Sequence, residues 1–175
     1  MNIPTAAGRI RLVAGSSPAA FLYVDTAQQS LSVVENGSIV KKYPVSTSRY
    51  GVGNRENSFM TPPGVHRVAE KYGGGAPAGR IFRDRLDTGE NWIIGSPGKP
   101  GEDLILTRIL RLEGLEDGIN RGPGIDSYER YIYIHGTNNE SSIGSPGSHG
   151  CVCMTSRDVI ELFDRVTEGT IVLID

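Results

Sequence analysis

A histidine and a cysteine separated by a short polar loop carry the most reactive chemistry in this chain. His135 ends an alternating run that begins at Tyr131, and Cys151 follows sixteen positions later, behind a Ser-His-Gly turn. The thiolate is the nucleophilic form of cysteine, and a free thiol has a pKa of about 8.5, so a reactive cysteine needs a base or a positive field nearby. An imidazole can take the thiol proton and return it to a leaving amine. The pair therefore predicts thiol-dependent acyl transfer or hydrolysis, with Cys151 as the nucleophile and His135 as its base.

The backbone around the cysteine suits the negative charge that develops on an attacked carbonyl oxygen. Gly150 opens a turn in which the consecutive N–H groups of His149, Gly150 and Cys151 are expected to bind that oxyanion. We expect Ser148 to hold this loop by a hydrogen bond. His149 is an alternative base, although we favour a role in shaping the site.

Two nearby side chains are candidates for lining the pocket. Tyr133 shares the face of its strand with His135, and Arg157 follows the cysteine closely. For both, an ordinary surface position is the alternative. The corresponding alternatives for the reactive pair are a small buried hydrophobe for Cys151 and a structural histidine for His135.

A second cysteine, Cys153, opens two other interpretations of the motif. Two thiolates and the imidazoles of His135 and His149 would suit tetrahedral zinc, but the C-x-C spacing is shorter than the usual spacing of zinc ligands, so no metal site is predicted. A reversible disulfide between Cys151 and Cys153 would act as a redox lock, although so small a ring is strained. A packed Cys153 without chemistry is the favoured interpretation.

The pair His135-Gly136 followed by Ser-His-Gly-Cys at 148–151 resembles the signature of the L,D-transpeptidase catalytic domain, also called the YkuD-type domain. That signature is a His-Gly or His-Ser pair, a spacer and then Ser-x-Gly-Cys. The segment Ser-Phe-Met-Thr-Pro-Pro-Gly at 58–64 is similar to the family's Thr-Pro-x-Gly segment. The resemblance covers residues 20 to 174, which is most of the chain.

The resemblance implies a triad of Cys151, His135 and Gly136. Because position 136 has no side chain, the backbone carbonyl of Gly136 is the implied acceptor for the imidazole N–H. His149 is implied to line the site and to contribute backbone to the oxyanion pocket. One residue departs from the family pattern: Cys153 stands where the family usually has Arg or Asn. The departure leaves the nucleophile intact but removes a polar side chain.

The resemblance also implies a substrate, a peptidoglycan stem peptide or muropeptide. Cleavage would fall between the L-centre of a diamino acid such as diaminopimelate and D-alanine, through a thioester acyl-enzyme. Attack by water would make the protein an L,D-carboxypeptidase of peptidoglycan recycling, which we favour. Attack by an amine would make it an L,D-transpeptidase that forms 3-3 crosslinks. Carbapenem-type β-lactams are expected covalent inhibitors, and a catalytically silent wall-binding module is the alternative from another class.

Composition and charge exclude several other classes. A chain of 175 residues predicts one domain spanning residues 1–175, and two cysteines are too few for a disulfide framework. A net charge of -2 gives no basic footprint for nucleic acid, and no cofactor is expected. Residues 1–9 lack the apolar core of a signal peptide, and no segment is long enough to span a membrane. We therefore expect a cytoplasmic protein, or a periplasmic one if the chain was trimmed.

The elements that must position these residues are mainly strands. The resemblance implies a β-sandwich of mixed sheets with one packed helix at about 155–167, which begins with a hydroxyl N-cap. Residues 1–8 are expected to be poorly ordered. Residues 73–90 are expected to form a flexible insertion, either a lid or a plain surface loop. Alternation and β-branched composition predict strands at 9–14, 21–25, 29–35, 38–47, 65–71, 92–94, 104–112, 129–135 and 170–174.

Overall fold

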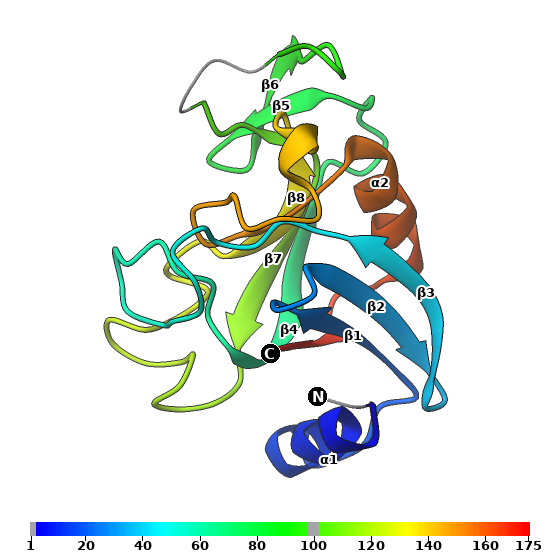
Figure 1. The fold of residues 1–175 in the computed structure, drawn as a ribbon, viewed down its shortest axis with the longest axis vertical. Helices are drawn as coiled ribbons and strands as arrows, with labels where there is room; N and C mark the ends of the chain where they lie inside the picture. The colour runs from blue at the N-terminus through cyan, green and yellow to red at the C-terminus, as the bar shows by residue number, and fades with distance from the viewer. Residues whose placement is uncertain (1–2, 98–101) are drawn as a thin grey trace.

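The computed structural model describes residues 3–97 and 102–175, which form two α-helices, one short 3-10 helix and ten strands (Figure 1). In chain order these are α1 (Ile3–Ala14), β1 (Ala20–Asp25), β2 (Ser30–Glu35), β3 (Ser38–Pro44), β4 (Gly64–Tyr72), β5 (Arg80–Arg83), β6 (Leu86–Asn91), β7 (Ile105–Gly114), β8 (Tyr133–Thr137), η1 (Glu140–Ser142), β9 (Val152–Met154), α2 (Ser156–Arg165) and β10 (Ile171–Ile174). Within these described ranges, no helix is both long and apolar enough to cross a membrane.

All ten strands join one hydrogen-bonded sheet, so the expected mainly β fold is confirmed. The order is β3-β2-β1-β10-β4-β7-β5-β6, with β8 paired to β7 and β9 paired to β8. The sheet is mixed, because β1 runs parallel to β10 and β8 runs parallel to β9. Strand β3, which ends at Pro44, forms one end of the order, where a proline without an N–H is tolerated.

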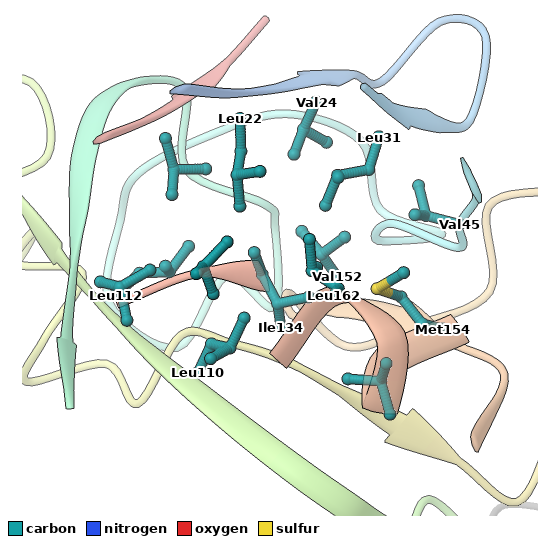
Figure 2. Close-up of a cluster of buried hydrophobic side chains, with 14 of the residues drawn as sticks. Leu22, Val24, Leu31, Val45, Leu110, Leu112, Ile134, Val152, Met154 and Leu162 are labelled. Carbon is teal, nitrogen blue, oxygen red and sulfur yellow. The ribbon is translucent and has the colours of Figure 1, made fainter. Parts of the chain in front are cut away.

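The sandwich-like core arises because this continuous sheet folds over on itself. Figure 2 shows Leu22 and Val24 of β1 pointing across the core toward Leu110 of β7, Ile134 of β8 and Val152 of β9. These side chains belong to one cluster of buried residues. Apolar residues from segments more than a hundred positions apart in the sequence therefore form a single core.

Helix α1 corrects the prediction for the N-terminus. Residues 9–14 were expected to form a strand, but they are the second half of a helix that begins at Ile3. Ala6 and Ile10, one helical turn apart, are fully buried against the face of the sheet that bears Phe21 and Tyr23. In a strand Leu12 would share the buried face of Ile10, but in the helix it points away from the sheet and is 84% exposed. Residues 3–8 are thus helical rather than poorly ordered, and residues 1–2 lie outside the described residues.

The segment at 73–90 contains a β-hairpin rather than an irregular insertion. Strands β5 and β6 pair across a two-residue turn at Asp84 and Arg85, which have φ of 49° and 68°. Strand β5 also pairs with β7, and Arg85 Nη1 donates to the Tyr133 hydroxyl at 3.0 Å. The hairpin, drawn in green above β8 in Figure 1, therefore contacts the strand that carries His135. Sequence alternation missed it because β6 is mostly exposed.

Two other expected strands differ from the structure. Residues 92–94 are not a strand, and Ile93 is 77% exposed. The strand expected at 129–135 begins only at Tyr133, because residues 127–131 form turns and Tyr131 has a φ of 55°. The remaining strands, at the predicted places within a few residues, are confirmed.

The helix after the cysteine forms as predicted. Thr155 is the N-cap of α2, and its side chain accepts the Asp158 N–H at 3.1 Å. At the other end, Lys71 Nζ donates to the carbonyl of Phe163 at 2.7 Å. Buried Val159 and Leu162 pack α2 onto the core beside β7 and β8. The helix thereby fixes the strand that immediately follows Cys151.

Docking of α1 can be tested with a matched pair of substitutions in the same helix. Ile10→Ala should lower the free energy of unfolding by about 2 to 5 kcal/mol, because removing most of a fully buried side chain leaves a cavity between the helix and the sheet. Leu12→Ala is the control and should change stability by less than about 0.5 kcal/mol, because Leu12 is mostly exposed. Urea denaturation followed by circular dichroism measures both, and equal effects would contradict the docked helix.

Candidate active site

Parallel pairing of β8 with β9 brings the two halves of the sequence motif together. Ile134 lies opposite Val152, and His135 lies opposite Cys153. Because successive side chains of a strand point to opposite faces, Ile134 and Val152 enter the core while His135 and Cys153 share the other face. Cys151 lies one residue before β9. The strand register therefore brings both thiols to the end of the sheet where His135 stands.

Cys151 and His135 line the same cavity, which has a volume of about 110 Å³. Its other walls are Asp103, Ile105 and His149. His135 is only 3% exposed, whereas Cys151 keeps part of its surface open. The Cys151 sulfur accepts the Tyr133 N–H at 3.4 Å. A thiol and an imidazole thus meet in one small recess that is reachable from outside.

The backbone of the next residue orients the His135 ring. Its Nδ1 is 2.8 Å from the carbonyl oxygen of Gly136, the contact that the family resemblance implies. A carbonyl can only accept, so Nδ1 carries the proton and Nε2 presents its lone pair. Nε2 is 3.7 Å from the sulfur of Cys153. Glycine is required at 136 because a Cβ there would lie 2.8 Å from the carbonyl oxygen of Leu106.

Burial keeps both reactive groups uncharged in the resting site. Desolvation raises the pKa of Cys151 to about 12, and Asp103 adds to the effect, while the Tyr133 N–H and Arg130 oppose it. Desolvation also lowers the pKa of His135, against the opposing effect of the Gly136 carbonyl. A neutral thiol and a neutral imidazole therefore share the cavity at neutral pH, with the Cys151 thiol donating to the Tyr131 carbonyl at 3.6 Å. Proton transfer between them must accompany attack on a substrate.

The turn before Cys151 is held by its own side chains. Ser148 Oγ donates to the carbonyl of Cys151 at 2.6 Å and accepts the Gly150 N–H at 3.2 Å. Ser148 is thus the loop hydrogen-bonder that the sequence predicts. The Gly150 N–H is engaged within the turn in this state, so the oxyanion expectation needs correction for that donor. Gly150 itself has a φ of 119°, which favours glycine.

His149 is tied to a carboxylate that the sequence analysis missed. Its Nδ1 is 2.8 Å from Asp103 Oδ2, and both side chains are about one-third exposed, at 33% and 36%. The rings of Tyr50 and Phe59 pack against the imidazole, with centroids 6.1 and 6.0 Å away. Asp103 lies in a polar loop and carried no sequence signal. Only the fold could place it beside His149.

The two candidate lining residues lie at different depths, and neither lines a cavity that contains a cysteine. Tyr133 is buried, and its ring meets His135 edge to face with centroids 6.5 Å apart. Its hydroxyl accepts from Arg85 of the hairpin, another residue that sequence reasoning missed. Arg157 is exposed on α2, which is the surface position given as its alternative.

A larger cavity of about 410 Å³ adjoins the first one. Asp103 and His149 line both cavities, and Cys153 lies in the wall of the larger. Arg49 and several polar side chains complete its lining. Within residues 3–97 and 102–175, no group of three or more His, Cys, Asp or Glu side chains is arranged to hold a metal ion.

Fold and site together define a class, a mainly β domain with a cysteine and a histidine in one recess at the end of a mixed sheet. The model of the L,D-transpeptidase catalytic domain family, YkuD, matches residues 19–174 of this chain. The chain therefore belongs to the L,D-transpeptidase catalytic domain family.

Two Bacillus proteins are similar to part of this chain. The chain is 58% identical over 42 residues to a YkuD protein of Bacillus licheniformis, a match that covers 24% of this chain and 26% of the relative. It is 55% identical over 47 residues to YkuD of Bacillus subtilis, which covers 27% of this chain and 29% of the relative. The matched segments thus span less than a third of either relative.

Solved structures share the fold at low sequence identity. An L,D-transpeptidase from Mycobacterium smegmatis superimposes with a TM-score of 0.57 at 18% identity, over 91% of this chain and 60% of that chain. The structure of L,D-transpeptidase LdtMt1 in complex with imipenem gives a TM-score of 0.54 at 18% identity, with the same coverage of 91% and 60%. This chain therefore spans about three-fifths of those proteins.

The raised pKa of Cys151 leads to a prediction about how its rate of alkylation depends on pH. Because its pKa is raised to about 12, Cys151 is protonated at neutral pH, and its thiolate fraction should rise about tenfold per pH unit up to about pH 11. The rate of alkylation by iodoacetamide, followed by mass spectrometry in Cys153→Ser, should rise with the same slope. A rate that levels off near pH 8 would show an ordinary or activated thiol instead.

Proposed function

We propose that Cys151 is the nucleophile and His135 the general base of an acyl transfer on peptidoglycan stem peptides. The observation that carries the proposal is the shared cavity of about 110 Å³, in which the ring fixed by the Gly136 carbonyl stands beside a partly open thiol. Membership of the L,D-transpeptidase family supports the substrate class. The bond attacked would join the L-centre of a diamino acid to D-alanine.

In this mechanism the thiol proton moves to Nε2 of His135 as the sulfur attacks the carbonyl carbon. The tetrahedral oxyanion would be stabilised by the backbone N–H groups of His149 and Cys151, since the Gly150 N–H is bound to Ser148. As the C–N bond breaks, the imidazolium returns its proton to the amine, D-alanine leaves, and a thioester to Cys151 remains. The Gly136 carbonyl carries no formal charge, so it stabilises the imidazolium less than a carboxylate would.

The fate of the thioester separates two activities. We favour attack by water, which makes the protein an L,D-carboxypeptidase that removes the terminal D-alanine of tetrapeptides during peptidoglycan recycling. The polar cavity beside the site supports this step, because it offers water a route to the thioester. Recycled stem peptides occur in the cytoplasm, so this proposal places the protein there.

One observation favours the second candidate, L,D-transpeptidation that forms 3-3 crosslinks. The cavity of about 410 Å³ falls within the usual size range of small-ligand sites, about 300 to 1,000 Å³. Its wall carries Arg49 and Asp103, which have opposite charges. Such a lining suits the zwitterionic end of a second stem peptide, which would supply the attacking amine. A periplasmic location would accompany this activity.

Covalent trapping by a carbapenem tests the nucleophile. Wild-type protein incubated with imipenem should gain the mass of one acyl adduct, and digestion should place it on Cys151. Cys151→Ala should give no adduct while keeping the thermal unfolding midpoint of the wild type within a few degrees. Arg157→Ala is the matched control and should be acylated like the wild type, because its side chain is exposed away from the cavities. Absence of an adduct on folded wild type would instead support a silent wall-binding module.

Products from a disaccharide tetrapeptide test the outcome of the reaction. Hydrolysis predicts a tripeptide and free D-alanine, whereas crosslinking predicts a dimer joined between the third residues. His135→Gln should lower kcat by at least about 100-fold, because the general base is lost. Mass spectrometry separates these products, and a dimer without tripeptide would overturn the preference for hydrolysis.

A further inference from the structure

A second thiol lies against the base of the proposed reaction. The sulfur of Cys153 is 3.7 Å from Nε2 of His135, and its side chain is only 2% exposed. Because Nδ1 carries the ring proton, the thiol of Cys153 is the donor in this contact. The imidazole that serves Cys151 is therefore also placed to deprotonate Cys153. The proposed acyl transfer has no use for this second thiol.

The chain spacing brings the two sulfurs within reach of each other. Two residues of extended chain span about 6.7 Å between Cα atoms, which is near the upper limit of the range of about 4.4 to 6.8 Å that disulfides bridge. His135 lies close to both thiols, because it lines the same small cavity as Cys151 and its Nε2 is 3.7 Å from the Cys153 sulfur. Desolvation raises the pKa of Cys153 well above its usual value, and the charge of nearby Cys151 adds to the effect. Gly150, directly before Cys151, leaves the backbone free to adjust.

Access to solvent separates the two thiols. Cys151 is partly exposed and opens into the smaller cavity, whereas Cys153, within strand β9, borders the larger cavity but is only 2% exposed. A small oxidant that enters the site therefore meets Cys151 first. An oxidised Cys151 would in turn lie within reach of a thiol that already has its base.

We propose that Cys153 is a resolving thiol, which converts a Cys151 oxidised by hydroperoxides into a reversible intramolecular disulfide. In the first step His135 takes the proton of the Cys151 thiol as its sulfur attacks a peroxide oxygen. The S–O bond forms as the O–O bond breaks, and the imidazolium protonates the departing hydroxide, so sulfenic acid and water form. In the second step His135 takes the proton of Cys153, whose sulfur attacks that of Cys151. The S–S bond forms as the S–O bond breaks, and the imidazolium protonates the departing hydroxide. The peroxide is reduced by two electrons, which the two thiols supply.

The disulfide would protect the nucleophile of the proposed function. A sulfenic acid without a resolving thiol can be oxidised further to sulfinic acid, which thiols do not reverse. A disulfide across one intervening residue is strained, and strained disulfides are the more easily reduced ones. The bond would therefore close the site during oxidation and reopen it when a dithiol reductant returns. The inference rests on the proposed function only in taking Cys151 as the group that is protected.

Both cysteines lie in one tryptic peptide, residues 131–157, which makes the test direct. Wild-type protein treated with hydrogen peroxide should lose two hydrogens from this peptide and resist alkylation at both positions. Dithiothreitol should then restore two alkylatable thiols and at least about nine-tenths of carbapenem acylation. Oxygen added to Cys151 with Cys153 still alkylatable, or a disulfide only between two molecules, would overturn the proposal.

Two variants test the order of events. Cys153→Ser keeps a hydrogen-bond donor beside His135 but forms no disulfide, so the same peroxide dose should give sulfinic acid at Cys151 and a loss of acylation that dithiothreitol does not reverse. Cys151→Ser should leave Cys153 reduced, because the buried thiol is shielded. Oxidation of Cys153 in Cys151→Ser at the wild-type rate would overturn the assigned roles.

The two proposals can fail separately. Reduced wild type that forms the disulfide on oxidation, but is never acylated by imipenem, would contradict the acyl transfer and leave the dithiol chemistry standing. Reduced wild type that is acylated, but forms sulfinic acid instead of a disulfide, would contradict only the resolving role of Cys153.

Discussion

The parallel pairing of β8 with β9 is the constraint on which the site depends. This register places His135 opposite Cys153 and leaves Cys151 at the entry to the strand. Because side chains alternate along a strand, a shift of one residue would turn the thiols into the core and bring Val152 out. The register is fixed by that burial, since Ile134 and Val152 are fully buried in the main cluster. Packing of the core therefore sets the geometry of the chemistry.

Cys151 and His135 are both strongly desolvated, and the backbone group that orients His135 carries no formal charge. Burial raises the pKa of Cys151 and lowers the pKa of His135, so charge separation is unfavourable until a substrate arrives. The imidazole is oriented by the Gly136 carbonyl rather than by a carboxylate. The one carboxylate in the recess, Asp103, is bound to His149. At rest the thiol is therefore protonated, and a base must take its proton before the sulfur can attack.

The strands of the sheet and the hairpin beside the recess differ in how firmly they are packed. Strands β7 and β8 are buried on both faces, whereas the hairpin of β5 and β6 reaches the site chiefly through Arg85 and the hydroxyl of Tyr133. Strand β7 also contains a bulge at Thr107, which has a φ of 72° and whose hydroxyl bonds to Ser156 of α2. Strain in a β-branched residue beside Gly136 indicates that the surrounding packing determines the local backbone.

The sequence by itself determined the features that depend on local spacing and local backbone preferences. The His-Gly and Ser-x-Gly-Cys segments, the capped helix and most strands follow from the residues alone. Only the tertiary structure decided the contacts between segments far apart in the chain, because periodicity carries no information about which strands pair or where a polar loop ends. It placed α1 on the sheet, Asp103 against His149 and Cys153 against His135, and it left Arg157 exposed on α2.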